Sequence, residues 1–192
     1  MKTKMMMICL AVVGGAVFAQ HDHGAVQSAP IHSKKEKATH SHRAAPVFQN
    51  QLADVFMVSL QLKEAFVSSD TAKVLVAIPE IRNSILKVDM SLLKDEVLMD
   101  WMGYLKTLNE SVVQISNSTD LIVQRKAFAS FNDAIYESIK MFGIGGMTAY
   151  YTYCPMANNN SGAYWLSNSK EIRNPYSGNV MLTCGKVKET LQ

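Results

Sequence analysis

Apolar side chains recur every three or four residues from Val47 to Phe142, which is the spacing of amphipathic helices. Four such segments follow one another in this part of the chain. They cover about residues 47–68, 74–92, 95–116 and 120–142. Because the connections between them are short, neighbouring helices are expected to run antiparallel. The pattern therefore predicts an all-α fold, an antiparallel four-helix up-and-down bundle over residues 47–143.

Residues that favour turns and helix ends lie between these segments. Ser68, Ser69 and Asp70 end the first segment and supply a cap for the second, and a cap at Asp120 begins the fourth. Gly143 follows the last apolar position, as expected for a helix end. Pro79 lies inside the second segment. Because proline lacks a backbone N–H, it is expected to kink or split that helix.

The pattern changes after Gly146 to a run of aromatic and β-prone residues that leads into Cys154 and Pro155. A second stretch of this kind covers Ala163–Ser167, with turn signals before and after it. Residues 144–192 are therefore expected to form a small irregular or two-stranded cap at one end of the bundle. Bundle and cap together make a single domain, residues 47–192.

The N-terminus has the pattern of a secretory signal peptide. Lys2 and Lys4 precede an apolar run, and Val17-Phe18-Ala19 precedes a polar stretch, so residues 1–19 are predicted to be cleaved. The mature protein is then exported, to the periplasm or beyond. No second apolar run approaches the length needed to span a membrane.

Charge and motif content exclude several function classes. Lys and Arg number 19 against 16 Asp and Glu, and loss of the signal peptide leaves the chain nearly neutral, which removes the electrostatic argument for nucleic-acid binding. No P-loop or glycine-rich dinucleotide turn occurs, and no histidine lies beyond residue 46 to serve a nucleophile as base. The same absence excludes a di-iron bundle built on Glu-x-x-His. The chain is therefore expected not to be an enzyme.

Residues 20–46 are predicted to form a disordered linker, and they contain every histidine of the chain. Closely spaced imidazoles on a flexible tether chelate divalent metals loosely. A solvated linker that happens to be rich in histidine is an equal alternative. The histidines of this secondary, loose metal site are His21, His23, His32, His40 and His42.

The C-terminal segment concentrates sulfur. Cys154 has Met156 two residues after it, and Cys184 has Met181 three residues before it. Thiolate and thioether ligands together suit Cu(I) or Ag(I), so these four residues are the predicted metal ligands. An even number of cysteines in an exported chain is also a common sign of a disulfide. Spacing alone leaves the metal site and the disulfide at even odds.

Trp165 and Tyr176 lie between the two sulfur pairs. An aromatic ring beside Cu(I) can protect the metal through a cation–π contact. The simpler interpretation, which we favour, is that both rings are hydrophobic pins that hold the cap to the bundle.

The tail motifs resemble those of a bacterial family of unassigned function. The shared patterns are Tyr-x-x-Cys-Pro-Met-Ala at residues 151–157, Tyr-Trp-Leu-Ser at 164–167, Ile-x-Asn-Pro-Tyr at 172–176 and Met-Leu-x-Cys-Gly at 181–185. That domain occurs alone in exported proteins and at the C-terminus of periplasmic adaptors of Cus-type copper and silver efflux systems. The resemblance implies a periplasmic role in handling copper or silver.

Two functions from different classes follow. In the first, the protein captures Cu(I) or Ag(I) with Cys154, Met156, Met181 and Cys184 and passes it to an efflux or homeostasis partner. In the second, the bundle is an interaction module that docks on another envelope protein, and a disulfide merely braces its cap. Replacement of both methionines distinguishes them, because only the first requires thioethers.

Overall fold

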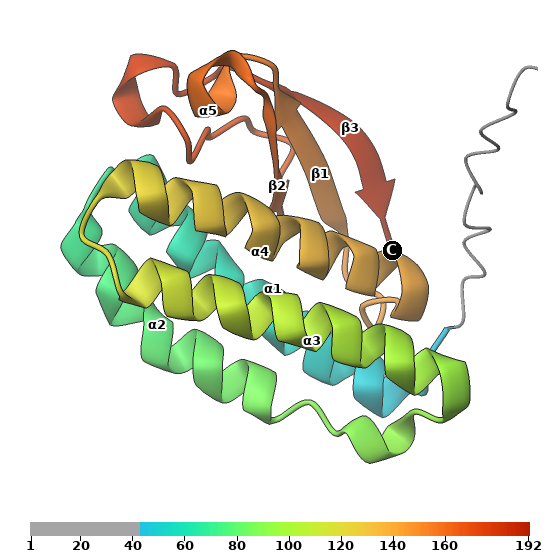
Figure 1. Ribbon diagram of the computed structural model, residues 1–192. Coiled ribbons are helices and arrows are strands. Elements are labelled where there is room, and N and C mark those ends of the chain that lie inside the picture. The colour runs from blue at the N-terminus through green and yellow to red at the C-terminus, as the bar shows by residue number, and fades with distance from the viewer. Residues whose placement is uncertain (1–42) are drawn as a thin grey trace, which may run out of the picture. The chain divides into compact units, whose positions relative to one another are not determined.

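The computed structural model describes residues 43–192, which contain four long helices and a small antiparallel sheet (Figure 1). The predicted signal peptide and the five histidines fall outside the described residues. The long helices are α1 (Pro46–Val67), α2 (Thr71–Leu86), α3 (Asp95–Ser116) and α4 (Leu121–Phe142), with a 3-10 turn, η1 (Met90–Leu92), between α2 and α3. Helix α1 packs against α2 and α4, and α3 packs against the same two helices. The predicted helical segments are thus confirmed in number and nearly in bounds.

The predicted helix ends are also confirmed. The Asp70 carboxylate accepts a hydrogen bond of 3.0 Å from the backbone N–H of Lys73, which caps α2. The Asp120 carboxylate does the same for Ile122 at the start of α4, at 2.8 Å. Gly143 ends α4 with a φ of 83°, a conformation that glycine adopts without steric cost.

Helix α2 departs from prediction in two ways. Of the two expected outcomes, a kink or a split at Pro79, the split does not occur, because α2 is one continuous helix through the proline. The buried stripe that includes Ile78 and Ile81 continues on both sides of the proline, and its burial offsets the lost backbone hydrogen bond. The helix also ends at Leu86, earlier than the apolar pattern indicated. Val88 is buried beyond its end without being helical.

The C-terminal region forms three strands and not two. They are β1 (Ala149–Cys154), β2 (Ala163–Ser167) and β3 (Lys186–Leu191), in the antiparallel order β2-β1-β3. The turn after β1 contains a short helical segment, α5 (Ala157–Asn160), and a second 3-10 turn, η2 (Gly178–Val180), precedes β3. The register of β1 and β3 shifts between Tyr151, opposite Glu189, and Thr152, opposite Val187. Lys188 is thus an extra residue, a β-bulge in β3.

The sheet packs along the side of α4, where the sequence indicated a cap over the end of the bundle (Figure 1). The Asn132 side chain, near the middle of α4, accepts a hydrogen bond of 3.1 Å from the backbone N–H of Leu166 in β2. The Phe128 and Tyr176 rings, with centroids 6.0 Å apart, join the helix to the loop that follows β2. One continuous core therefore extends from the helices into the sheet.

No helix among residues 43–192 is long and apolar enough to cross a membrane.

Asn132→Ala tests the attachment of the sheet. The change leaves the buried N–H of Leu166 without its acceptor, and we expect a loss of about 1–3 kcal/mol in the free energy of unfolding. Urea denaturation measures it. The matched control is Asn109→Ala on the exposed surface of α3, which should change stability by less than about 0.5 kcal/mol. Equal effects of the two changes would contradict the role assigned to Asn132.

Candidate functional site

Strand pairing brings the two cysteines together. Cys154 is the last residue of β1, and Cys184 lies two residues before β3 begins. Because the strands are antiparallel, the end of β1 lies beside the start of β3, with Tyr153 opposite Lys186. The Cα atoms of Cys154 and Cys184 are 5.8 Å apart, and their Sγ atoms are joined as a disulfide. The structure therefore shows the oxidised form of the pair.

The two cysteines differ in exposure. Cys154 has an exposed fraction of 0%, whereas Cys184 is half-buried. Gly185, the residue after Cys184, allows this part of the chain to pack closely against β1 and β2. A Cβ atom at this position would lie 2.7 Å from the Trp165 ring and 3.2 Å from the Tyr153 carbonyl oxygen, and its φ of 143° favours glycine. Cys184 thus forms the outer side of a closely packed disulfide.

A fully buried asparagine organises the turn that carries Met181 and Cys184. The Asn174 N–H donates to the Leu182 carbonyl at 2.8 Å, and its side-chain amide donates to the Cys184 carbonyl at 3.1 Å. Its side-chain oxygen accepts a bond of 2.8 Å from the Tyr176 N–H. Cys184 in turn donates its N–H to the Met181 carbonyl at 3.0 Å. The conformation of this turn is therefore specified by buried hydrogen bonds.

The two methionines lie close to the disulfide in the chain. Met156 is 45% exposed, and Met181 is half-buried. Met156 precedes three consecutive asparagines, Asn158, Asn159 and Asn160, with φ of 50°, 55° and 65°. Asparagine tolerates this left-handed conformation better than most residues, yet a run of three is uncommon and stores strain. Met156 is thus held at the start of an unusual, tightly turned loop.

Within residues 43–192 no cluster of three or more His, Cys, Asp or Glu side chains could hold a metal ion. The disulfide also leaves neither thiolate free. A soft-metal centre at this place would therefore require reduction of the pair and would depend on thioether sulfur in addition to the two thiolates.

Trp165 and Tyr176 are both buried, and their ring centroids are 6.1 Å apart. The Tyr176 hydroxyl donates to the Tyr164 carbonyl oxygen at 2.7 Å. Both rings thus join the sheet to the following loop, and the Tyr176 ring also contacts Phe128 of α4, as expected of a pin between cap and bundle. Burial raises the pKa of Tyr176 well above its usual value, so its hydroxyl remains protonated.

Two arginines attach the loop between β2 and β3 to the helices. The Arg125 guanidinium donates to the Pro175 carbonyl at 2.8 Å, to the Phe66 carbonyl at 3.0 Å and to the Ser69 hydroxyl at 2.8 Å. Arg173 donates twice to one carboxylate oxygen of Glu64, at 3.0 and 2.8 Å. Burial lowers the pKa of Arg125. The loop that contains Met181 is thereby bonded to α1 and α4.

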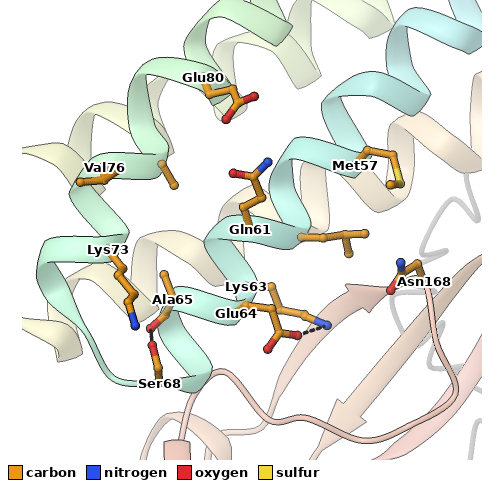
Figure 2. A pocket seen from close by; sticks show the side chains of 12 residues that line it. Met57, Gln61, Lys63, Glu64, Ala65, Ser68, Lys73, Val76, Glu80 and Asn168 are labelled. Atoms are coloured by element: carbon orange, nitrogen blue, oxygen red, sulfur yellow. Dashed lines mark hydrogen bonds and ion pairs between the residues drawn. The ribbon is translucent and has the colours of Figure 1, made fainter.

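A groove lies between α1 and α2, with a volume of about 810 Å³ (Figure 2). Lys63 and Glu64 of α1 both line it: the buried Lys63 ammonium lies 2.9 Å from the Glu64 carboxylate and donates to the Ser167 hydroxyl at 3.4 Å. Met57 and Val76 are apolar residues exposed along its walls. Sequence reasoning missed this groove, and those two residues, which are apolar but outside the buried stripes, are the only signal that pointed to it.

The comparisons with known proteins concern the helices. Residues 55–146 match a family described as "Protein of unknown function (DUF3347)". The match begins within α1 and ends after α4, so it does not include any of the four sulfur residues. Searches among curated proteins and among solved structures found no match. The chain is similar to a family without assigned function, and its tail extends beyond that similarity.

The asymmetric burial of the disulfide makes a chemical prediction. An incoming thiolate can approach the half-buried Cys184 but not the fully buried Cys154, so exchange should form a mixed disulfide at Cys184 and release Cys154 as the thiolate. Brief treatment with glutathione, acid quenching, alkylation and peptide mass mapping would show glutathione on Cys184 and alkylation on Cys154. Glutathione on Cys154 would contradict it.

The Glu64–Arg173 pair makes a pH prediction. Partial burial alone would raise the pKa of Glu64, but hydrogen bonds from Arg173 and Lys63 outweigh it and lower the pKa below the usual 4.5. A depressed carboxylate pKa stabilises the fold above the unfolded-state pKa, and this contribution is lost as the pH falls through the folded-state value. Glu64→Gln should therefore lower stability at pH 7 and reduce the further loss on acidification below pH 4.5.

Thermal unfolding from pH 7 to pH 3 measures this difference. Glu96→Gln, at an exposed position near the start of α3, is the control and should follow the parent chain. A Glu64→Gln curve parallel to that of the parent chain would show that the pair does not respond to acid.

Proposed function

We propose that this protein is an exported, periplasmic soft-metal binding protein that holds Cu(I) or Ag(I) and passes it to an efflux or homeostasis partner. The observation that carries the proposal is the 5.8 Å separation of the Cα atoms of Cys154 and Cys184, produced by the pairing of β1 with β3. Reduction of the disulfide would leave two thiols side by side. Two thiolates in this position suit a low-coordinate Cu(I) ion.

The two methionines complete the proposed ligand set. Met156 and Met181 lie within three residues of the cysteines, on turns whose backbones are specified by the fold. Thioethers bind Cu(I) more weakly than thiolates do, so a partner can displace them first. The exposure of Met156 favours it as the ligand that a partner reaches first. The histidines of residues 20–46 would serve as a loose first binding site.

Anaerobic titration of the reduced, signal-free protein with Cu(I) against a colorimetric chelator tests the proposal. We expect tight binding of one Cu(I) per chain, lost in a Cys154→Ser, Cys184→Ser double variant and retained after deletion of residues 20–42. Met156→Leu with Met181→Leu should weaken binding, whereas Met99→Leu with Met102→Leu, at exposed positions on α3, should not. Unchanged binding in the double cysteine variant would overturn the proposal.

A second function, a docking module without a metal role, is favoured by two observations. The disulfide closes a loop with a sequence separation of 30, for which chain entropy predicts about 3–4 kcal/mol of stabilisation, so a purely structural role is sufficient to explain it. The groove between α1 and α2 provides a recessed surface with apolar and charged walls. In this case the helices form an up-and-down bundle that serves as scaffold, and the methionine changes leave the protein unaffected.

A further inference from the structure

Four tyrosines from three elements form one continuous stack that reaches the end of β1. Tyr136 of α4 lies against Tyr151 of β1, with ring centroids 3.7 Å apart and planes 10° apart. Tyr151 lies against Tyr164 of β2 at 4.6 Å and 11°. Tyr164 lies against Tyr153 of β1 at 4.4 Å and 37°. Tyr153 is the residue before Cys154 in β1, so the stack begins one residue from the sulfur site, although the ring and the cysteine side chain lie on opposite faces of the strand. The stack ends on α4.

Two of these phenols donate hydrogen bonds to carboxylates. The Tyr151 hydroxyl donates to the Asp133 carboxylate at 3.0 Å, and the Tyr136 hydroxyl donates to the Glu189 carboxylate at 2.6 Å. The Lys140 ammonium donates to the Tyr136 oxygen at 2.9 Å. The tyrosine pKa values are raised, in both cases first by burial, so the rings are neutral phenols at pH 7.

This arrangement has the parts needed for stepwise oxidation of phenols. A phenol that loses an electron becomes strongly acidic, so its oxidation is easiest where a base already accepts its hydrogen bond. Rings in face-to-face contact exchange electrons readily because their π-systems touch. Packing alone does not require phenols, since phenylalanine would fill the same space without burying hydroxyl groups.

We propose that Tyr153, Tyr164, Tyr151 and Tyr136 form an electron relay that protects the sulfur site from strong one-electron oxidants. A hydroxyl-type radical that arises near Cys154 takes one electron from the stack and is reduced to hydroxide. The oxidised residue is then Tyr151 or Tyr136. Its phenolic proton moves to the carboxylate that accepts its hydrogen bond, Asp133 or Glu189 respectively, and a neutral tyrosyl radical remains. A small reductant of the ascorbate class then returns one hydrogen atom to the tyrosyl radical.

The relay does not depend on a bound metal, so its test is separate from the copper titration. The disulfide-intact protein is exposed to a photogenerated ruthenium(III) complex, rapidly frozen and examined by electron paramagnetic resonance. We expect a neutral tyrosyl radical with the spectral signature of a hydrogen-bonded phenoxyl. Tyr136→Phe with Tyr151→Phe should lose that signal.

Tyr150→Phe is the matched control. Tyr150 lies in β1 next to Tyr151, under the Lys170 ammonium at 5.8 Å, and it is not part of the stack. This variant should give the parent signal. Thermal unfolding and thiol counting confirm that each variant is folded and oxidised.

Asp133→Asn with Glu189→Gln provides a test that keeps all four rings. An amide accepts a hydrogen bond but does not take up a phenolic proton, so the radical should form in lower yield and decay faster. The proposal is overturned if the tyrosine double variant retains the parent signal, or if the amide variant and the parent chain give radicals of equal yield and lifetime.

Discussion

The packing of the small sheet against the side of α4 is the interaction on which the other features depend. A sheet of three short strands has little stability alone and requires a partner that buries one of its faces. Here the Asn132 side chain of α4 accepts a hydrogen bond from the Leu166 N–H of β2. The contact between Phe128 and Tyr176 continues the core into the following loop. The disulfide, the turns that carry Met156 and Met181, and three of the four stacked tyrosines all lie in the segment that this contact orders.

The helices were predictable from sequence because each buries one stripe. Apolar spacing and caps such as Asp120 located three of the four segments to within a residue or two. The second segment shows the limit of periodicity. Val88 continues the apolar rhythm and is buried, yet the chain has already left the helix at Leu86. Burial and helicity are separate properties there, and a pattern of apolar positions reports only burial.

Strand β3 was missed for a different reason. Its sequence, Lys186–Leu191, is mostly charged or polar, with Val187 and Leu191 as its apolar residues, so it has no signal of a buried strand. The strand forms because β1 offers it an edge. Because β3 was not predicted, the spacing of the cysteines could not show that Cys154 and Cys184 lie side by side. The sequence therefore did not distinguish a disulfide from a pair of free thiols.

The groove and the tyrosine stack lay beyond sequence reasoning, because their residues come from separate elements. Asp133 and Tyr136 are distant in sequence from Tyr151, and the relation appears only when β1 lies on α4. The candidate ligands themselves were recognisable from local chemistry, since each methionine is close to a cysteine in the chain. Local patterns revealed the residue types, and tertiary structure determined which of them meet.

The bulge at Lys188 has a consequence for how this tail can change in evolution. By adding one residue to β3, it moves every earlier position along β1 by one place, and this offset is what brings the segment around Cys184 level with Cys154. If Lys188 entered the ladder with no change in strand length, Lys186 would lie opposite Cys154 and Cys184 would move one place farther from it. Deletion of Lys188 would instead keep Val187 opposite Thr152 and Lys186 opposite Tyr153. The cysteine pair can therefore survive the loss of the bulge residue but not a slip of β3 by one place: the pairing of Tyr153 with Lys186 is constrained more tightly than the length of the strand.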